Sequence, residues 1–263
     1  MVWEWNRYPH IPILVTMKPS PRLLLGQKLY WTEKKDGSNI AVWLDEKGDV
    51  QISSRNQKVA SSDLQALVRK TEDFSKIVKL LNENPQFVIY VEACRKGRSI
   101  TGIEVYERDI CFLFDIYDVA AKKFLPHVNV HQHAFHHKIP VVKLYAETRH
   151  RSMKSLLKFR NHVLKYCEAM KVEGMVIKAY RIPKKYEQLK TWREFAGGLI
   201  QAKVKLDIPE PVKRKIQKGE PIYPPIPDNE VMGAIDKVWQ ELGTEAFKDV
   251  SKAMPLVAKY VAE

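Results

Sequence analysis

Hydrophobic and polar residues alternate along several short segments of the chain, which is the pattern of β-strands with one buried face. Near the start, this alternation covers residues 28–32, 40–44 and 49–55. Two strongly apolar strands are predicted at 87–92 and 110–117, and two strands that end in lysine at 173–178 and 199–205. Asp36-Gly37 lies between the first two strands and is typical of a tight turn, so we expect a hairpin there.

Other segments have the three- and four-residue spacing of amphipathic helices. Ser61, Ser62 and Asp63 are expected to cap a helix, and a second helix is predicted around residues 74–81. Residues 153–170 give the clearest helical periodicity, whereas the first 26 residues carry four prolines and are expected to form an irregular arm. The mixture of strands and helices predicts the α+β class.

The chain is expected to divide into two parts. Residues 1–208 contain the predicted strands, and a proline-rich segment from 209 to 227 has the composition of a linker. Beyond it, Asp228 and Thr244 can each cap a helix. We therefore predict a larger domain over residues 1–208 and a small helical C-terminal domain over residues 209–263.

The charge of the chain indicates a polyanionic partner. The formal net charge is +13, and nucleic acid is the first candidate because no long basic amphipathic helix indicates a membrane surface. Cys94, Cys111 and Cys167 form no CxxC pair, which favours a reducing compartment. No apolar run is long enough to span a bilayer and the first residues lack signal-peptide features, so a cytoplasmic location is expected.

Residues 127–137 hold five of the eight histidines. Their spacing does not match a recognised set of metal ligands, and no cysteine lies nearby in the sequence. A short helix with some exposed imidazoles is the expected structure.

Lys34 lies two residues before Asp36-Gly37, between two apolar runs. It is either a solvated lysine of a surface hairpin or a nucleophile at a strand end that attacks phosphorus. Other polar side chains also occur at predicted strand ends: Arg55, Glu92, Glu173, Lys178, Lys203 and Lys205. Each has an ordinary structural explanation by itself, but together they favour a nucleotide site.

Taken in order, these segments resemble the motifs of the covalent nucleotidyltransferase superfamily of ligases and capping enzymes. Lys34-Lys35-Asp36-Gly37 resembles motif I, Ser54-Arg55 motif Ia, and Tyr90-Val91-Glu92 motif III. Leu113-Phe114-Asp115 resembles the aromatic motif that follows, residues 173–178 resemble motif IV, and Lys203-Val204-Lys205 resembles motif V.

The chain is most similar to the RNA ligase 2 branch of that superfamily. Glu33 and Asn39 both fit this branch, and so does a helical segment after motif V where capping enzymes and most DNA ligases continue into an OB fold. Asp36 stands where some members carry histidine, so this position does not choose the nucleic acid. The resemblance implies an antiparallel-sheet nucleotidyltransferase core, similar to ATP-grasp ligases.

The resemblance implies an ATP-dependent RNA ligase. Lys34 would attack ATP in the presence of Mg²⁺ (or Mn²⁺) to form lysyl-AMP. The AMP would pass to an RNA 5′-phosphate, and a 3′-OH would then displace it, as RNA repair requires. Neighbouring cations, for which Lys178, Lys203 and Lys205 are candidates, and a bound metal would favour the neutral Lys34 amine.

The resemblance also assigns roles to individual residues. Glu92 is expected to accept from the ribose hydroxyls, Phe114 to stack on adenine, and Glu173 to contact the metal through water. The residues expected to bind the nucleotide are Glu33, Asp36, Gly37, Asn39, Arg55, Glu92, Phe114, Glu173, Lys178, Lys203 and Lys205. The residues expected to bind RNA are Arg95, Lys96, Arg98, Lys213, Arg214, Lys215 and Lys218.

Three alternatives remain at this point. A small ATP-dependent DNA ligase would use the same pocket. A non-catalytic nucleic-acid-binding protein on a ligase fold is a different class, and the presence of Lys34, Glu92, Glu173, Lys203 and Lys205 argues against it. A capping guanylyltransferase is least favoured, because the segment after motif V is expected to be helical.

Overall fold

The structure is a computed structural model, and it describes residues 5, 7–17, 20–181, 198–206 and 237–238. The chain divides into two compact units, Met1–Gln217 and Lys218–Glu263. The first unit contains all the strands named below. The predicted domain boundary at residue 208 and the predicted linker lie outside the described residues, so that division stays a prediction.

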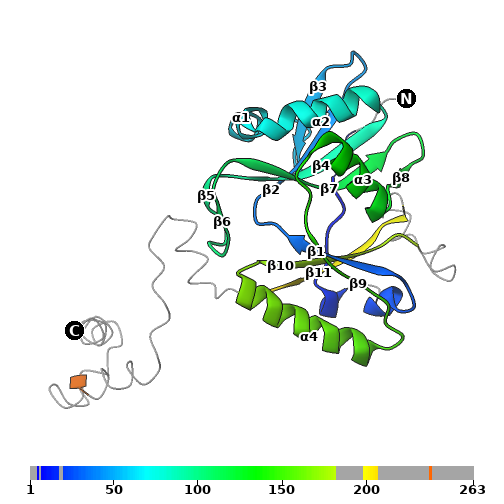
Figure 1. Ribbon diagram of the computed structural model, residues 1–263, viewed down its shortest axis with the longest axis vertical. Coiled ribbons are helices and arrows are strands. Elements are labelled where there is room, and N and C mark those ends of the chain that lie inside the picture. The colour runs from blue at the N-terminus through cyan, green and yellow to red at the C-terminus, as the bar shows by residue number, and fades with distance from the viewer. Residues whose placement is uncertain (1–4, 6, 18–19, 182–197, 207–236, 239–263) are drawn as a thin grey trace. The chain divides into compact units, whose positions relative to one another are not determined.

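One sheet of the first unit has four strands and is antiparallel throughout. Its strands, in spatial order, are β11 (Ile200–Lys205), β10 (Gly174–Ala179), β1 (Leu29–Lys34) and β9 (Leu144–Thr148). Helix α4 (Met153–Met170) packs on its outer face with the short helices η1 (Leu14–Thr16) and η2 (Pro21–Leu24) (Figure 1). The core on that face contains Trp31, Leu156, Val163 and Ile177, all fully buried.

The second sheet has five strands and carries its own layer of helices. Its strands, in spatial order, are β3 (Val50–Ser54), β2 (Ser38–Leu44), β4 (Phe87–Cys94), β7 (Ile110–Asp118) and β8 (Lys123–Phe124). The helices on its outer face are α1 (Ser62–Lys70), α2 (Glu72–Glu83) and α3 (His127–His137) (Figure 1). A separate two-stranded hairpin follows β4 and consists of β5 (Gly97–Arg98) and β6 (Val105–Tyr106).

The inner faces of the two sheets share a third apolar cluster. It contains Tyr8 from the N-terminal arm, Trp43, Val88 and Tyr90 from the five-stranded sheet, and Leu199, which directly precedes β11. Because side chains alternate along a strand, every strand that sends one set of residues to its helices sends the other set between the sheets. This alternation decides which polar residues can meet at a site.

The strand pairing corrects one sequence prediction. Residues 28–32 and 40–44 do form strands, but β1 belongs to the four-stranded sheet and β2 to the five-stranded sheet, so they do not form a hairpin. Asp36-Gly37 instead connects the two sheets. Gly37 is needed for close packing, because a Cβ there would lie 2.5 Å from the Ala93 carbonyl oxygen. Turn composition indicates a change of direction but does not name the partner strand.

The α+β class and the main helices agree with the sequence pattern. Helix α4 covers the predicted range, α3 covers the histidine segment, and α2 is two residues longer at each end than predicted. Strand β9 was not predicted, because neither of its faces is fully buried and its sequence lacks clear alternation. The predicted irregular arm contains η1 and η2, and the Lys203 N–H donates to the Pro12 carbonyl at 2.8 Å.

Candidate active site

Lys34 lies at the end of β1 and its side chain points between the two sheets. In the register of the four-stranded sheet, Lys34 faces Gly174, which in turn faces Lys205. Val176, two residues further along β10, faces Lys203. Neighbouring strands lie about 4.8 Å apart, so period-2 alternation gathers these side chains on one face.

The Lys34 ammonium forms an ion pair with Glu173. Its Nζ lies 2.5 Å from Glu173 Oε2, and the two side chains are 23% and 8% exposed. Burial lowers the pKa of Lys34, but Glu173, Glu92 and Asp36 together raise it by more, so the pKa lies above its ordinary value. In the free protein Lys34 is therefore charged. The expected neighbouring cations do not by themselves give a neutral amine, because carboxylates surround the lysine more closely.

Two of those cations are nevertheless close to Lys34. Burial, Lys205, Lys34 and Arg55, in that order, lower the pKa of Lys203. Lys205 also acts electrostatically on Glu173. Lys203 and Lys205 belong to β11, and Arg55 directly follows β3. These cations lie near one another, which indicates a site that will accept negative charge.

Lys178 has different partners from those expected. Its side chain is 2% exposed, and Nζ donates to Asp115 Oδ1 at 2.8 Å and to the Phe114 carbonyl at 2.6 Å. Asp115 is itself fully buried and accepts from the Tyr8 hydroxyl through Oδ2. The charge of Lys178 is thus compensated within the protein, although the residue still lines the pocket beside Lys34.

Glu92 lines the same pocket as Lys34 and accepts a hydrogen bond from the Gly37 N–H at 3.1 Å. Burial raises its pKa to about 7, and the charges of Glu173 and Asp36 add to this effect, while Lys34 and the Gly37 N–H oppose it. A carboxyl group that is half protonated near neutral pH can accept from or donate to a sugar hydroxyl.

Two acidic residues beside Lys34 in the sequence, Glu33 and Asp36, bond to other residues of the protein. Asp36 Oδ2 accepts from both the N–H (2.6 Å) and the hydroxyl (2.5 Å) of Thr101, in the loop between β5 and β6. Glu33 points to the opposite face of β1 from Lys34 and pairs with Lys35 at 3.0 Å. Lys35 also pairs with Glu104 at 3.2 Å. These contacts fix the backbone on either side of Lys34.

The pocket around Lys34 also contains residues that sequence reasoning missed. Predicted members that line it are Glu33, Lys34, Asn39, Glu92, Phe114 and Lys178. Unpredicted members are Tyr8, Ile11, Thr32, Lys35, Val142 and Val176. Val176 and Thr32 could have been found from alternation, since they share the inner face with Lys178 and Lys34. Tyr8 and Ile11 could not, because only the fold brings the N-terminal arm to β11 and Phe114.

The sequence comparison with protein families decides the classification. A family model described as RNA ligase matches residues 27–192, which is more than half of the chain. The chain belongs to the RNA ligase family. The matched segment contains Lys34, Glu92, Phe114, Glu173 and Lys178 but stops before Lys203 and Lys205. No curated protein sequence matches the chain.

Solved structures similar to this RNA ligase family member include both RNA and DNA ligases. A putative ATP-dependent DNA ligase from Aquifex aeolicus has 16% identity and a TM-score of 0.55, and the match covers 97% of this chain and 58% of that one. An archaeal ATP-dependent RNA ligase has 11% identity and a TM-score of 0.56, with 97% and 63% covered. A Naegleria gruberi RNA ligase variant with AMP and Mn has 15% identity and a TM-score of 0.57, with 76% and 55% covered.

These similarities establish the nucleotidyltransferase fold of the ligases. The matches span between 55% and 63% of the length of these three solved chains. The resemblance to an ATP-grasp-like ligase core with antiparallel sheets is thereby confirmed at the level of fold, and membership of the RNA ligase family is confirmed by the family match.

The predicted RNA-binding residues are placed only in part. Arg95 and Lys96 are exposed directly after β4, where the Lys96 N–H donates to Asp109 Oδ1 at 2.7 Å. Arg98 belongs to β5. Lys213, Arg214, Lys215 and Lys218 lie outside the described residues. Their roles stay predictions of the sequence.

The residues around Lys34 have the chemistry of a divalent-cation site. The charges of Glu173 and Asp36 contribute to the raised pKa of Glu92, and the charge of Asp36 contributes to that of Glu173, so the three carboxyl groups lie near one another. Such a concentration of carboxylate oxygens fits Mg²⁺ or Mn²⁺, which prefer oxygen ligands. Glu173, which faces Lys34, is the residue suited to hold such an ion, directly or through water.

The histidine segment contributes a group that its spacing did not indicate. Glu83 and the adjacent His136 and His137 bring possible ligand atoms within 4.8 Å of one another. His137 Nε2 lies 3.4 Å from Glu83 Oε2. The group lies on α2 and α3, on the outer face of the five-stranded sheet.

In the described part of the chain, no helix is long and apolar enough to cross a membrane.

Proposed function

We propose that the chain is an ATP-dependent RNA ligase that joins 5′-phosphate and 3′-OH ends through lysyl-AMP at Lys34. The observation that carries this proposal is the Lys34–Glu173 ion pair in a pocket that also contains Glu92 and Phe114. An amine at the end of a rigid strand, with an aromatic wall and a carboxylate beside it, has the parts that nucleotidyl transfer needs.

In the first step, the Lys34 nitrogen attacks the α-phosphorus of ATP. The N–P bond forms, the bond from that phosphorus to the pyrophosphate oxygen breaks, and Lys34 gives up a proton. Glu173 Oε2 is the base nearest to that proton, at 2.5 Å from Nζ. A divalent cation bound with ATP supplies positive charge, which favours the neutral form of the amine.

The remaining residues bind and orient the nucleotide. Phe114 and Val176 present apolar surface for the adenine, and Glu92 accepts hydrogen bonds from the ribose. Arg55, Lys203 and Lys205 stabilise the negative charge that shifts onto the phosphates. Asp36 acts indirectly: its bonds to Thr101 hold the loop that follows Lys34.

The second and third steps use RNA. An oxygen of the RNA 5′-phosphate attacks the phosphorus of lysyl-AMP and releases Lys34, and the 3′-OH then attacks the activated 5′-phosphate and releases AMP. The excess of Lys and Arg provides contacts to the RNA backbone.

Cys94, Cys111 and Cys167 are free and buried, which supports a reducing compartment such as the cytoplasm.

Covalent labelling with α-labelled ATP tests this proposal. Lys34→Ala should lose the adduct completely. Lys35→Ala should keep most of it, because Lys35 Nζ is paired with Glu33 and Glu104. Peptide mapping of the wild-type adduct then identifies the labelled residue. Labelling of Lys35, or an adduct in Lys34→Ala, would contradict the assignment, and stronger labelling by GTP would favour capping chemistry.

A DNA ligase is the second candidate, because a putative DNA ligase is among the similar structures. Nicked duplexes that differ only in ribose or deoxyribose at the 3′-OH side separate the two. We expect faster sealing with ribose at that side. Equal or faster sealing with deoxyribose would assign the chain to DNA.

A further inference from the structure

A second pocket lies at the opposite end of β1 from Lys34. Its volume is about 540 Å³, within the range of about 300 to 1,000 Å³ that is usual for ligand sites. It shares no lining residue with the pocket around Lys34. Lys28, which lines it, is six positions before Lys34, so their Cα atoms lie about 20 Å apart at about 3.3 Å per residue, although Tyr30 of this pocket and Thr32 of the other are only two positions apart.

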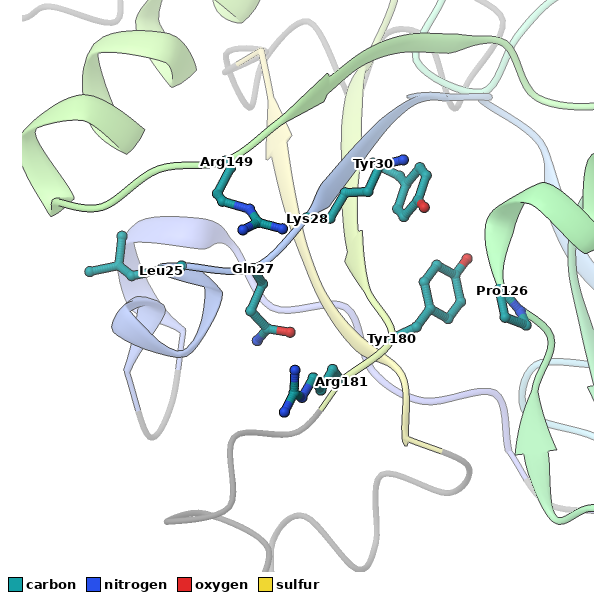
Figure 2. A pocket seen from close by; sticks show the side chains of 9 residues that line it. Leu25, Gln27, Lys28, Tyr30, Pro126, Arg149, Tyr180 and Arg181 are labelled. Carbon is teal, nitrogen blue, oxygen red and sulfur yellow. The ribbon is translucent and has the colours of Figure 1, made fainter.

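The second pocket is cationic. Lys28, Arg149 and Arg181 line it, and the lining residues that the structure describes include neither Asp nor Glu. Figure 2 shows the side chains of Arg149 and Arg181 on either side of Gln27, one from the loop after β9 and one from the end of β10. Lys28 pairs with Glu147 at 2.6 Å, whereas the two arginines have no ion-pair partner among the residues that the structure describes. Two guanidinium groups that pair with no described carboxylate favour a phosphate, which they can bind with parallel hydrogen bonds.

The opposite wall of the second pocket is aromatic. Tyr30 lies on the inner face of β1, and Tyr180 directly follows β10 (Figure 2). Their ring centroids are 5.8 Å apart and their ring planes make an angle of 70°. Aromatic side chains provide stacking surface for nucleobases, a contribution of about 1–3 kcal/mol per base. The pocket therefore combines a phosphate-binding side and a base-binding side.

Two buried polar atoms of the second pocket lack a partner. The Tyr180 hydroxyl and the Gln27 side-chain oxygen make no hydrogen bond to any described part of the chain. The Gln27 amide nitrogen is already committed, since it donates to the Leu23 carbonyl. Buried groups of this kind are usually satisfied. The Gln27 oxygen, an acceptor, belongs to the side of the pocket with the two arginines, and the Tyr180 hydroxyl, a donor, to the side with Tyr30 (Figure 2).

We propose that this second pocket binds one nucleotide of the RNA strand, with its phosphate at Arg149 and Arg181 and its base against Tyr30 and Tyr180. The inference rests on the proposed function and deepens it, because it names a part of the substrate that the ligase holds away from the reacting end. At about 3.4 Å per stacked nucleotide, 20 Å corresponds to about six nucleotides from the reacting end. The pocket would then select for strands of at least that length.

Binding of RNA oligonucleotides of two lengths tests the inference. Fluorescence anisotropy is measured for a 12-nucleotide and a 4-nucleotide RNA with a 5′-phosphate, using wild type, the pair Arg149→Ala with Arg181→Ala, and Tyr180→Phe. The matched control is Lys158→Ala with Lys165→Ala, which removes two exposed charges from α4, on the outer face of the four-stranded sheet. Unfolding curves show that each variant is folded.

We expect the arginine pair to weaken binding of the long RNA at least tenfold and to leave the short RNA within twofold. The salt slope of binding should fall by about 0.7, because one phosphate contact is lost. Tyr180→Phe should weaken only the long RNA, by severalfold, and the control pair should act equally on both lengths. Unchanged binding of the long RNA, or equal losses for both lengths, would overturn the inference.

Failure of the inference can be told apart from failure of the proposed function. Binding is measured without ATP and does not depend on ligation. If Lys34 forms no adduct but the arginine pair still weakens the long RNA, only the ligase activity is refuted. If the adduct forms and the arginine pair binds RNA normally, only the role of the second pocket is refuted.

Discussion

Replacing Lys178 with methionine should destabilise the protein by about 3–5 kcal/mol, because it leaves the Asp115 carboxylate without its cation in the interior. Both side chains are almost fully buried, at 2% and 0% exposure, and their charged atoms lie 2.8 Å apart. Tyr8 would remain as the donor to Asp115. Since domains are usually stable by about 5–15 kcal/mol, the loss is a large part of the total.

A double-mutant cycle identifies the cause of that loss. Asp115→Asn alone should also be costly, since it leaves the buried Lys178 ammonium with only neutral acceptors, the Asn oxygen and the Phe114 carbonyl, and no compensating charge. Combining the two changes removes both charges. We expect the double variant to be more stable than the sum of the single effects predicts, by at least about 1 kcal/mol.

Urea unfolding, followed by tryptophan fluorescence at pH 7, measures these free energies. The control is Arg108→Met, which breaks the ion pair with Glu72 on the surface, where the side chains are 49% and 77% exposed. Exposed pairs contribute about 0–1 kcal/mol, so the control should change little. A loss below about 1 kcal/mol for Lys178→Met, or additivity within about 0.5 kcal/mol, would refute the structural role of Lys178 and return it to nucleotide binding alone.

Two other predictions concern the pocket around Lys34. Gly174→Ala should destabilise the fold by about 1–3 kcal/mol and impair adduct formation, because its Cβ would lie 2.2 Å from the Val204 carbonyl oxygen and displace β11 with Lys203 and Lys205. The control Gly48→Ala adds a Cβ where φ is +82° and no atom lies within 4 Å, so it should cost about 1 kcal/mol and leave the adduct unchanged. Equal effects of the two substitutions on the adduct would contradict this reasoning. The pKa of Glu92 is raised from 4.5 to about 7, so between these pH values the folded state binds more protons than the unfolded state. The stability contributed by this group therefore falls as pH rises from about 4.5 to 7, by at most about 3 kcal/mol. Unfolding curves at pH 5 and pH 8 should therefore differ less in Glu92→Gln than in wild type, and an unchanged difference would contradict the shifted pKa.

The sequence by itself determined the longer helices, most of the longer strands and the polar residues at the ends of those strands, but not β9 or the two-residue strands β5, β6 and β8. Alternation placed the strands ending at Lys34, Glu92 and Lys205 to within a few residues, because a two-residue period follows from the geometry of the extended chain. Helical spacing gave α4 its full length for the corresponding reason. The order of the motifs indicated a ligase, and the family match bears out the family.

Only the tertiary structure decided how these elements pair and which polar groups neutralise one another. Nothing local distinguishes a hairpin at Asp36-Gly37 from a crossing between two sheets, because strand pairing depends on partners more than a hundred residues away, such as β10 for β1. The same holds for Lys178, whose partner Asp115 lies on the other sheet, and for Tyr8, which reaches both Asp115 and Gln201. Charged residues that cannot be told apart in the sequence have different partners in the fold, because a buried charge is stable only when it is paired with an opposite charge nearby.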